Sequence, residues 1–270
     1  MKSNASAGSI DIRDVYSGPQ GTLYSLLMGQ QLHIGGMKAS IDLAERAGVG
    51  AGQRGIDLCC GNGGGMRVLV RFREVLSMVG VELTPANIEK GERLCSDEGL
   101  TDRIRFVACD ACENGLPSGS ADFVWGEDGW CYVPDKPKLV AEAARLVRPG
   151  GTIAFTDWVE GPTEMSADEA QRALGLMNFA NVQDIPGYVQ LLDANGCEVR
   201  IAEDTGRLPH FFDLSLQMTE KQFTYDILAT VHFREDILEI IKENFRFFGD
   251  LGRAGKMIQA RFIAQRTRGS

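Results

Sequence analysis

Hydrophobic and polar positions along this chain alternate between two spacings from about residue 37 to residue 157. Short apolar runs of strand length are followed by stretches in which apolar residues recur at helical spacing. Short connections between alternating strands and helices predict a parallel, doubly wound α/β sheet with right-handed crossovers. The predicted strands of this part end at Asp57, Glu82, Asp110, Asp128 and Asp157.

The pattern changes after Asp157. Helical spacing is found over 167–179 and 182–194, and a strand-like run follows over 197–203. A long region rich in Phe and Met, 207–250, then has helical spacing, and 256–265 reads as a final strand. With the five strands before it, this predicts a seven-stranded sheet with a helical insertion before its last strand.

A glycine-rich stretch, Gly55 to Gly65, lies where the first strand meets the next helix. An apolar run ends there in Asp57, several glycines follow, and a helix begins near Met66. Such a turn allows close backbone approach and presents a helix N-terminus, which is how α/β proteins hold nucleotide-like ligands. Taken alone, the loop would also suit a dinucleotide such as NAD.

The acids at the strand ends add to this signal. Ligands in such sheets bind beyond the carboxyl ends of the strands, and Asp57, Glu82, Asp110 and the pair Glu127-Asp128 all come there. The separation of Asp57 and Glu82 is close to that of the dinucleotide fingerprint, in which the second acid binds ribose hydroxyls. The ordered series predicts one ligand site at this edge.

Composition and charge narrow the classes of partner. The net charge is −9 and no run of Lys or Arg occurs, so we expect no nucleic-acid partner. No segment has the apolar length of a membrane span, and the N-terminus is not a signal peptide. Seven cysteines without disulfide spacing indicate a reducing, cytoplasmic compartment. Cys109 and Cys112 have the spacing of a metal pair, but no second pair follows, so we expect no metal.

These motifs together resemble the class I S-adenosylmethionine-dependent methyltransferases. Residues 57–63 are similar to their Asp-x-Gly-x-Gly-x-Gly loop, although Cys59 stands where the first Gly is usual. Residues 146–151 are similar to their leader into the fifth strand. The resemblance covers roughly residues 30–160 and implies a Rossmann-like fold, a transferase of the EC 2.1.1 class and S-adenosyl-L-methionine as cofactor. It assigns these residues to the cofactor: Asp57, Cys59, Gly61, Gly63, Glu82 (ribose), Leu83, Asp110 and Ala111 (adenine), and Glu127.

A narrower resemblance is to the sarcosine/dimethylglycine N-methyltransferases and related small-molecule enzymes. It rests on 29–35, on Pro134-Asp135-Lys136 and on 252–256, whereas the stretch 127–132 departs from their pattern. It implies N-methylation of a small amine such as sarcosine or dimethylglycine. On this reading His33 or a tyrosine would act as the base, and Trp130, Trp158 and Arg253 would contact the acceptor.

Other interpretations remain open from the sequence. The tryptophans could be ordinary packing, and Arg253 could pair with a nearby acid instead of a substrate carboxylate. The acceptor could carry an oxygen, sulfur or metalloid atom, or the protein could bind the cofactor without catalysis. A homodimer is left open.

We expect five regions along the chain: a disordered tail over 1–9, an N-terminal lid with the first helix over 10–50, the cofactor-binding core over 51–206, a helical cap over 207–252, and the last core strand with a tail over 253–270.

Overall fold

The computed structural model describes residues 19–267, except for the side chains of residues 19–21, 24 and 25. The tail predicted over 1–9, the first part of the predicted lid and the last three residues lie outside this range. Within it, the division of the chain into lid, core and cap stays a prediction, and the elements themselves are as follows.

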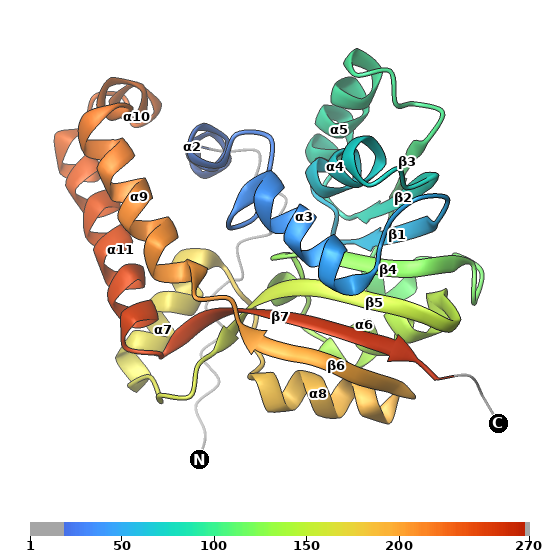
Figure 1. The fold of residues 1–270 in the computed structure, drawn as a ribbon. Helices are drawn as coiled ribbons and strands as arrows, with labels where there is room; N and C mark the ends of the chain where they lie inside the picture. Colours follow the sequence, from blue (N-terminus) through green and yellow to red (C-terminus); the bar gives the residue numbers. More distant parts are fainter. Residues whose placement is uncertain (1–18, 268–270) are drawn as a thin grey trace.

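A seven-stranded sheet in the order β3-β2-β1-β4-β5-β7-β6 forms the centre of the molecule (Figure 1). Its strands are β1 (Arg54–Leu58), β2 (Ser77–Glu82), β3 (Ile104–Ala108), β4 (Ala121–Glu127), β5 (Val147–Glu160), β6 (Cys197–Asp204) and β7 (Met257–Arg266). The first five are parallel, with the switch in strand order between β1 and β4. The predicted fold class, a doubly wound α/β sheet of the class I methyltransferase type, is confirmed.

Helices cover both faces of the sheet, as the alternating pattern predicts. On one face lie α3 (Gly36–Ala47), α4 (Gly64–Phe72) and α5 (Pro85–Asp97), whose apolar side chains share a core with Phe123 and Trp125 of β4. On the other lie α6 (Lys136–Leu146) and α8 (Ile185–Ala194), which pack on Val124 and Phe155. Adjacent residues of β4 thus point to opposite cores, because side chains alternate along a strand. Two short 3-10 helices, η1 (Ala111–Glu113) and η2 (Trp130–Tyr132), follow β3 and β4.

The last strand differs in direction from the five strands that were predicted to be parallel. β7 lies between β5 and β6 and is antiparallel to both. Between β6 and β7 the chain forms α9 (Arg207–Lys221), α10 (Thr224–Thr230) and α11 (Glu235–Arg253), which we call the cap. α9 leads away from the end of the sheet and α11 returns to it (Figure 1). Because the cap starts and finishes at the same end of the sheet, the next strand must run in the opposite direction.

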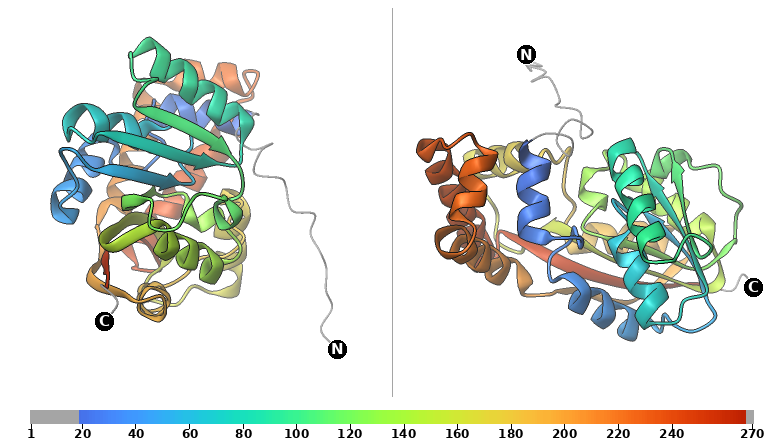
Figure 2. Two further views of the ribbon diagram at one scale, coloured as in Figure 1. Left: turned by 90° about the vertical axis from the view of Figure 1, so that its right-hand side faces the viewer. Right: turned by 90° about the horizontal axis from the view of Figure 1, so that it is seen from above.

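The cap rests on α7 (Ala167–Met177) and on α2 (Pro19–Met28). In Figure 1 and in the right-hand view of Figure 2, α2 lies between the cap and the core helices. A third apolar cluster joins these parts and includes Ile34, Trp158, Phe212 and Phe248.

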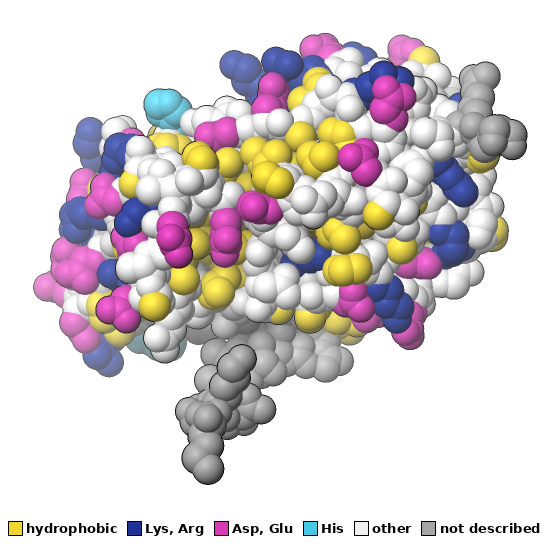
Figure 3. Space-filling view, turned by 90° about the horizontal axis from the view of Figure 1, so that it is seen from below, with side chains coloured by type: hydrophobic (Ala, Val, Ile, Leu, Met, Phe, Trp, Pro, Cys, Tyr) yellow, Lys and Arg dark blue, Asp and Glu magenta, His cyan; other side chains and the backbone are white. Residues whose placement is uncertain are grey.

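Charges are mixed on the surface. On the face drawn in Figure 3, Lys and Arg side chains are interspersed with Asp and Glu, and hydrophobic side chains lie between them. Among the helices of residues 19–267, none combines the length and the apolar character needed to cross a bilayer.

Candidate functional site

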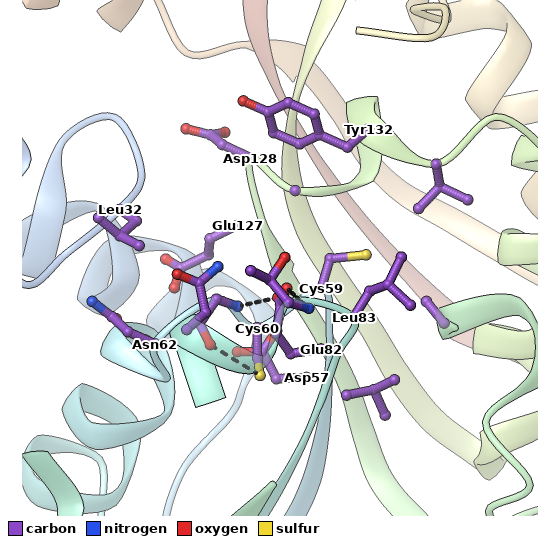
Figure 4. Close-up of a pocket in the computed structure, with 18 of the residues that line it drawn as sticks. Leu32, Asp57, Cys59, Cys60, Asn62, Glu82, Leu83, Glu127, Asp128 and Tyr132 are labelled. Carbon is purple, nitrogen blue, oxygen red and sulfur yellow. Dashed lines mark hydrogen bonds between the residues drawn. The ribbon is translucent and has the colours of Figure 1, made fainter. Parts of the chain in front are cut away.

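A pocket lies at the carboxyl edge of β1, β2 and β4 (Figure 4). Asn62, Leu32 and Glu127 lie on one side of it, Cys59 and Leu83 on the other, and Asp128 and Tyr132 above (Figure 4). Of the residues predicted for the cofactor or for catalysis, these line it: His33, Asp57, Cys59, Gly61, Glu82, Leu83, Asp110, Ala111 and Glu127. Residues from positions 33 to 127 therefore meet in one place, which follows from the register of parallel strands.

Glu82 holds the glycine-rich loop in position. Its Oε2 accepts a hydrogen bond from the Gly61 amide at 2.8 Å, and its Oε1 accepts one from the Thr84 amide at 2.8 Å (Figure 4). Thr84 precedes Pro85, the first residue of α5. One carboxylate thus links the ends of β1 and β2, so that an acid predicted as a ligand contact also has a structural role.

The glycines at the start of α4 allow the chain to pack closely. A Cβ atom on Gly64 would lie 2.5 Å from the Gln30 carbonyl oxygen, and one on Gly65 would lie 2.1 Å from Glu127 Oε2. Gly63 is the N-cap of α4 with φ 71° and is the one predicted cofactor position that does not line the pocket. Its place is set by packing, because a Cβ there would lie 2.7 Å from the Phe106 ring.

Cys59 takes the left-handed backbone conformation that its usual glycine would take, with φ 63°. This conformation costs a residue with a side chain roughly 1–2 kcal/mol. Gly129 makes room for the extra atoms, since a Cβ at Gly129 would lie 2.9 Å from both Cys59 Cβ and the Cys59 carbonyl oxygen. The loop therefore keeps its shape, and the Cys59 side chain lines the pocket.

Asp57 is the most unusual side chain of the pocket. It is buried, and among the described residues neither its Oδ1 nor Nδ2 of Asn62 in the loop has a hydrogen-bond partner. Burial, followed by the charges of Glu127 and Glu82, raises the pKa of Asp57 well above its ordinary value. A carboxyl group held in this way destabilises the fold at neutral pH, so its surroundings suit a cationic ligand that can donate hydrogen bonds.

His33 lies at the rim beside Glu127. Its Nε2 is 3.3 Å from Glu127 Oε1, 3.1 Å from Ser40 Oγ and 3.0 Å from the Gly36 carbonyl oxygen. Only 5% of the residue is exposed. These contacts fix the imidazole ring at the start of α3, with the Glu127 carboxylate placed to stabilise a positive charge on it.

Asp128 joins the segment before α3 to the sheet. Its Oδ2 accepts a hydrogen bond from the Ile34 amide at 2.8 Å, and Gln259 Nε2 of β7 donates to Oδ1 at 2.9 Å and to Oδ2 at 2.7 Å. Asp128 was noted in the sequence only as a neighbour of Glu127, because its partners are distant along the chain. The sequence assigned no ligand role to several lining residues: Leu32, Cys60, Asn62, Thr84, Asn87, Cys109 and Tyr132. Cys60 and Asn62 could have been included, since they belong to the loop itself.

The structure places the three predicted acceptor contacts in different parts of the molecule. Trp130 is 0% exposed, stacks on Phe155 at 3.9 Å between ring centroids and donates from Nε1 to the Leu58 carbonyl oxygen at 3.3 Å. It is packing within the core, not a wall of the pocket. Trp125 is also fully buried, in the core of the opposite face. The three tryptophans therefore form no common cage.

Two further acceptor predictions also fall outside this pocket. Trp158 packs against Phe179, Phe212 and Phe248 and lines a second cavity under the cap. Arg253 lies at the end of α11, where it pairs with Asp213 at 2.9 Å and Asp250 at 2.8 Å. Both partners of Arg253 are nearby acids, which was the alternative that the sequence left open. In residues 19–267 no group of three or more His, Cys, Asp or Glu side chains is placed to hold a metal ion.

Known proteins are similar to this chain in sequence. The family model described as a methyltransferase domain matches residues 56–155, which run from within β1 to within β5 and include most of the pocket. A probable chloroplastic tocopherol O-methyltransferase of Oryza sativa is 34% identical over 42% of this chain and 31% of its own length. The 27-O-demethylrifamycin SV methyltransferase of Amycolatopsis mediterranei is 30% identical over 58% of each chain. Residues 56–155 therefore match the methyltransferase domain family, and they lie in a sheet with the strand order of the class I methyltransferase fold.

Solved structures share the fold of this methyltransferase chain. One from Galdieria sulphuraria, provisionally named a sarcosine dimethylglycine methyltransferase, has a TM-score of 0.75 at 23% identity and 86% coverage of both chains. Phosphoethanolamine N-methyltransferase 2 of Haemonchus contortus, in complex with S-adenosyl-L-methionine, has a TM-score of 0.84 at 19% identity, covering 97% of this chain and 61% of the other. The [4+2]-cyclase SpnF has a TM-score of 0.74 at 18% identity and 96% coverage of both.

The match over residues 56–155 bears out the predicted methyltransferase family and, with it, S-adenosyl-L-methionine as the cofactor. The residues present suit that cofactor: the loop is rich in glycine, and Asp57 Oδ1, which has no partner among the described residues, can accept a hydrogen bond from a cationic ligand. The chain spans between about a third and three fifths of the length of the curated relatives named above. What the methyltransferase acts on is therefore a matter for proposal.

Proposed function

We propose that this protein transfers the methyl group of S-adenosyl-L-methionine to a small-molecule acceptor. The observation that carries the proposal is Asp57, a buried carboxyl group without a partner for Oδ1 at the end of β1. Such a group has no structural benefit of its own, and it lies in a pocket with Glu82, Asp110 and Glu127. Strongly perturbed groups of this kind gather at functional sites.

In this proposal, different pocket residues contact different parts of the cofactor. Asp57 and Glu127 would face its cationic methionine end, next to Cys59 and Gly61 of the loop. Glu82 would bind the ribose hydroxyls, which compete with the loop amides for its oxygens. Leu83, Asp110 and Ala111 would contact the adenine. Gly63 would act indirectly by allowing the turn into α4.

The cofactor, when bound, supplies a methyl carbon on a positively charged sulfur. Transfer would break the carbon–sulfur bond, whose electron pair would stay on sulfur, as the acceptor's nucleophilic atom became bonded to the methyl carbon. An N–H or O–H acceptor also loses a proton, and His33, stabilised by Glu127, would take it. Charge is dispersed in this step, so positioning and exclusion of water supply most of the rate.

The identity of the acceptor is not carried over from the relatives. Their names point to tocopherol, a rifamycin and phosphoethanolamine, which differ widely in polarity. The fold alone does not fix the reaction either, since a [4+2]-cyclase shares it. A cofactor-binding protein without methyl transfer, or an oxygen, sulfur or metalloid acceptor, remains the alternative.

The sarcosine-like motifs have structural roles here. Asp135 caps α6 through the Lys138 amide at 2.9 Å. Lys136 is buried and donates to the Val133 carbonyl oxygen at 2.6 Å and to Asn181 Oδ1 at 2.8 Å. Near the last strand, Gly252 packs against Pro209. These motifs therefore support N-methylation of sarcosine or dimethylglycine only weakly.

Calorimetry with S-adenosyl-L-methionine tests the cofactor site. We expect Asp57→Ala and Glu82→Ala to lower the affinity at least tenfold, because a hydrogen bond to a charged group contributes about 1.5–3 kcal/mol. Glu89→Ala, at an exposed position of α5, is the matched control and should bind as the wild type does. Mass spectrometry for S-adenosylhomocysteine over a panel of amines, alcohols, phenols and thiols tests transfer. Full affinity in both variants, or no product with any acceptor, would count against the proposal.

A further inference from the structure

A second cavity of about 270 Å³ lies under the cap. Its walls come from α2, α7 and all three cap helices, together with Trp158 of β5. These elements are far apart in the sequence, but they lie at the same end of the molecule in Figure 1 and in the right-hand view of Figure 2. The cavity exceeds the roughly 150 Å³ of an apolar cavity that holds benzene. It is therefore large enough for a ligand with more than one ring or a short branched chain.

The lining of this cavity is apolar. All but two of the described lining side chains are hydrocarbon, aromatic or thioether groups, and none is charged. The two polar ones already have partners: Thr230 Oγ1 donates to the Asp226 carbonyl oxygen at 3.0 Å, and Asn244 Oδ1 accepts from Arg172 Nη2 at 3.0 Å. An ionised carboxylate or ammonium group placed here would lose its hydration without gaining a partner, which costs several kcal/mol or more.

The cavity and the cofactor pocket share a wall. Tyr132 lines the cofactor pocket and meets Phe179 edge-to-face at 5.0 Å between ring centroids. Phe179 in turn meets Trp158, a lining residue of the cavity, at 5.6 Å. The backbone makes a second link, because Met28 lines the cavity and Leu32 and His33 line the pocket. Three aromatic side chains in successive contact, Tyr132, Phe179 and Trp158, thus form the layer between the cofactor pocket and the cap cavity.

We propose that the cap cavity binds the body of the methyl acceptor, and that this acceptor is an uncharged molecule with an apolar, ring-containing or branched body larger than benzene. This inference rests on the proposed methyltransferase function and specifies its substrate class. A zwitterionic amino acid such as sarcosine does not fit it. The nucleophilic atom of the acceptor lies at the end directed toward Tyr132 and His33, where the methyl group is presented.

Binding of an uncharged fluorescent probe, N-phenyl-1-naphthylamine, to the full chain tests the cavity without catalysis. We expect saturable binding that Ile241→Trp weakens at least tenfold, because Ile241 lines the cavity and the larger ring fills it. Ile240→Trp is the matched control, one residue away on the outer face of α11, where Ile240 is 49% exposed. It should change the probe affinity less than twofold. No saturable binding, or equal losses in the two variants, would overturn the inference.

Cofactor affinity, measured by calorimetry on the same samples, shows that the variants have folded. If Ile241→Trp no longer binds the cofactor, Val231→Phe is used instead, because phenylalanine fills the same cavity with a smaller side chain. We expect the same loss of probe binding in that variant.

Turnover separates this inference from the proposed function. We expect S-adenosylhomocysteine from uncharged apolar acceptors, with a raised KM in the cavity-filling variant. Turnover of sarcosine that Ile241→Trp leaves unchanged would overturn the inference while the methyltransferase proposal stands. Failure of the wild type to bind S-adenosyl-L-methionine would instead overturn the proposed function.

Discussion

Two residues of the glycine-rich loop are held in states that the isolated chain would avoid. Asp57 keeps a buried carboxyl group near two other acids, and Cys59 keeps a left-handed backbone. Each state is unfavourable by itself and persists because the surrounding packing fixes it. Both lie in the cofactor pocket, so the cost in stability is placed where a ligand can offset it.

For Asp57, we expect a trade-off between stability and binding. Asp57→Asn removes a charge that is buried and repelled by Glu127 and Glu82, so the free energy of unfolding of the cofactor-free protein at pH 8 should rise by about 1 kcal/mol or more. Cofactor affinity should fall at least tenfold in the same variant. Urea denaturation and calorimetry measure the two effects. A variant that is less stable and binds normally would show that Asp57 has a structural role instead.

For Cys59, the fit against Gly129 can be tested directly. Gly129→Ala should lower the free energy of unfolding by about 1–3 kcal/mol, because the new Cβ overlaps Cys59. The loss should be smaller in a Cys59→Gly background, where one of the two close contacts is removed. Gly175→Ala is the control, since nothing lies within 4 Å of a Cβ there and alanine favours the helix. Equal losses in both backgrounds would rule out this contact.

At the scale of elements, the Asp128 carboxylate joins the segment between α2 and α3 to the sheet. Asp128 connects the Ile34 amide with Gln259 of β7, across 94 and 131 residues of sequence. The same segment carries Leu32 and His33 into the cofactor pocket and Met28 into the cap cavity. The position of this segment therefore affects both the cofactor pocket and the cap cavity.

Removing this link should loosen the segment. Asp128→Ala leaves the Ile34 amide without its acceptor, and we expect a loss of about 1–3 kcal/mol in the free energy of unfolding and faster hydrogen exchange at Ile34. Asp128→Asn is the conservative control, because asparagine keeps one acceptor oxygen and tolerates the φ of 56° found at this position. Identical exchange at Ile34 in both variants would contradict this role.

At the scale of the whole molecule, buried acids make stability depend on pH. Asp157 is fully buried, and burial is the main cause that raises its pKa from 3.8 to about 7, although the Tyr188 hydroxyl at 2.7 Å opposes the shift. Between these two pKa values the folded protein holds a proton that the unfolded chain has released. The contribution of Asp157 to stability is thus complete below pH 3.8 and is lost as the pH rises through about 7.

We therefore expect the free energy of unfolding to decrease between pH 5 and pH 7, with a contribution from Asp157 of up to about 1.4 kcal/mol per pH unit. Asp157→Asn should flatten this dependence, whereas Asp193→Asn, at an exposed position of α8, should keep it. Chemical denaturation at a series of pH values measures it. The same slope in both variants would exclude Asp157 as its source.

The sequence by itself determined the elements and the cofactor edge. Alternation within β4, the cap Thr84 with Pro85 before α5, and the glycine loop are local signals, and they depend only on residues close together in the chain. The convergence of Asp57, Glu82, Asp110 and Glu127 also followed, because parallel strands present their carboxyl ends at one edge.

Only the tertiary structure decided the rest. The reversed direction of β7, the burial of Trp130 on Phe155, the pairing of Arg253 with Asp213 and the link through Asp128 each depend on a partner far away in the chain. The cap cavity depends on five helices and a strand meeting around one space. Local patterns cannot specify such features, because the same apolar side chain packs a core or lines a cavity according to what the fold places opposite it.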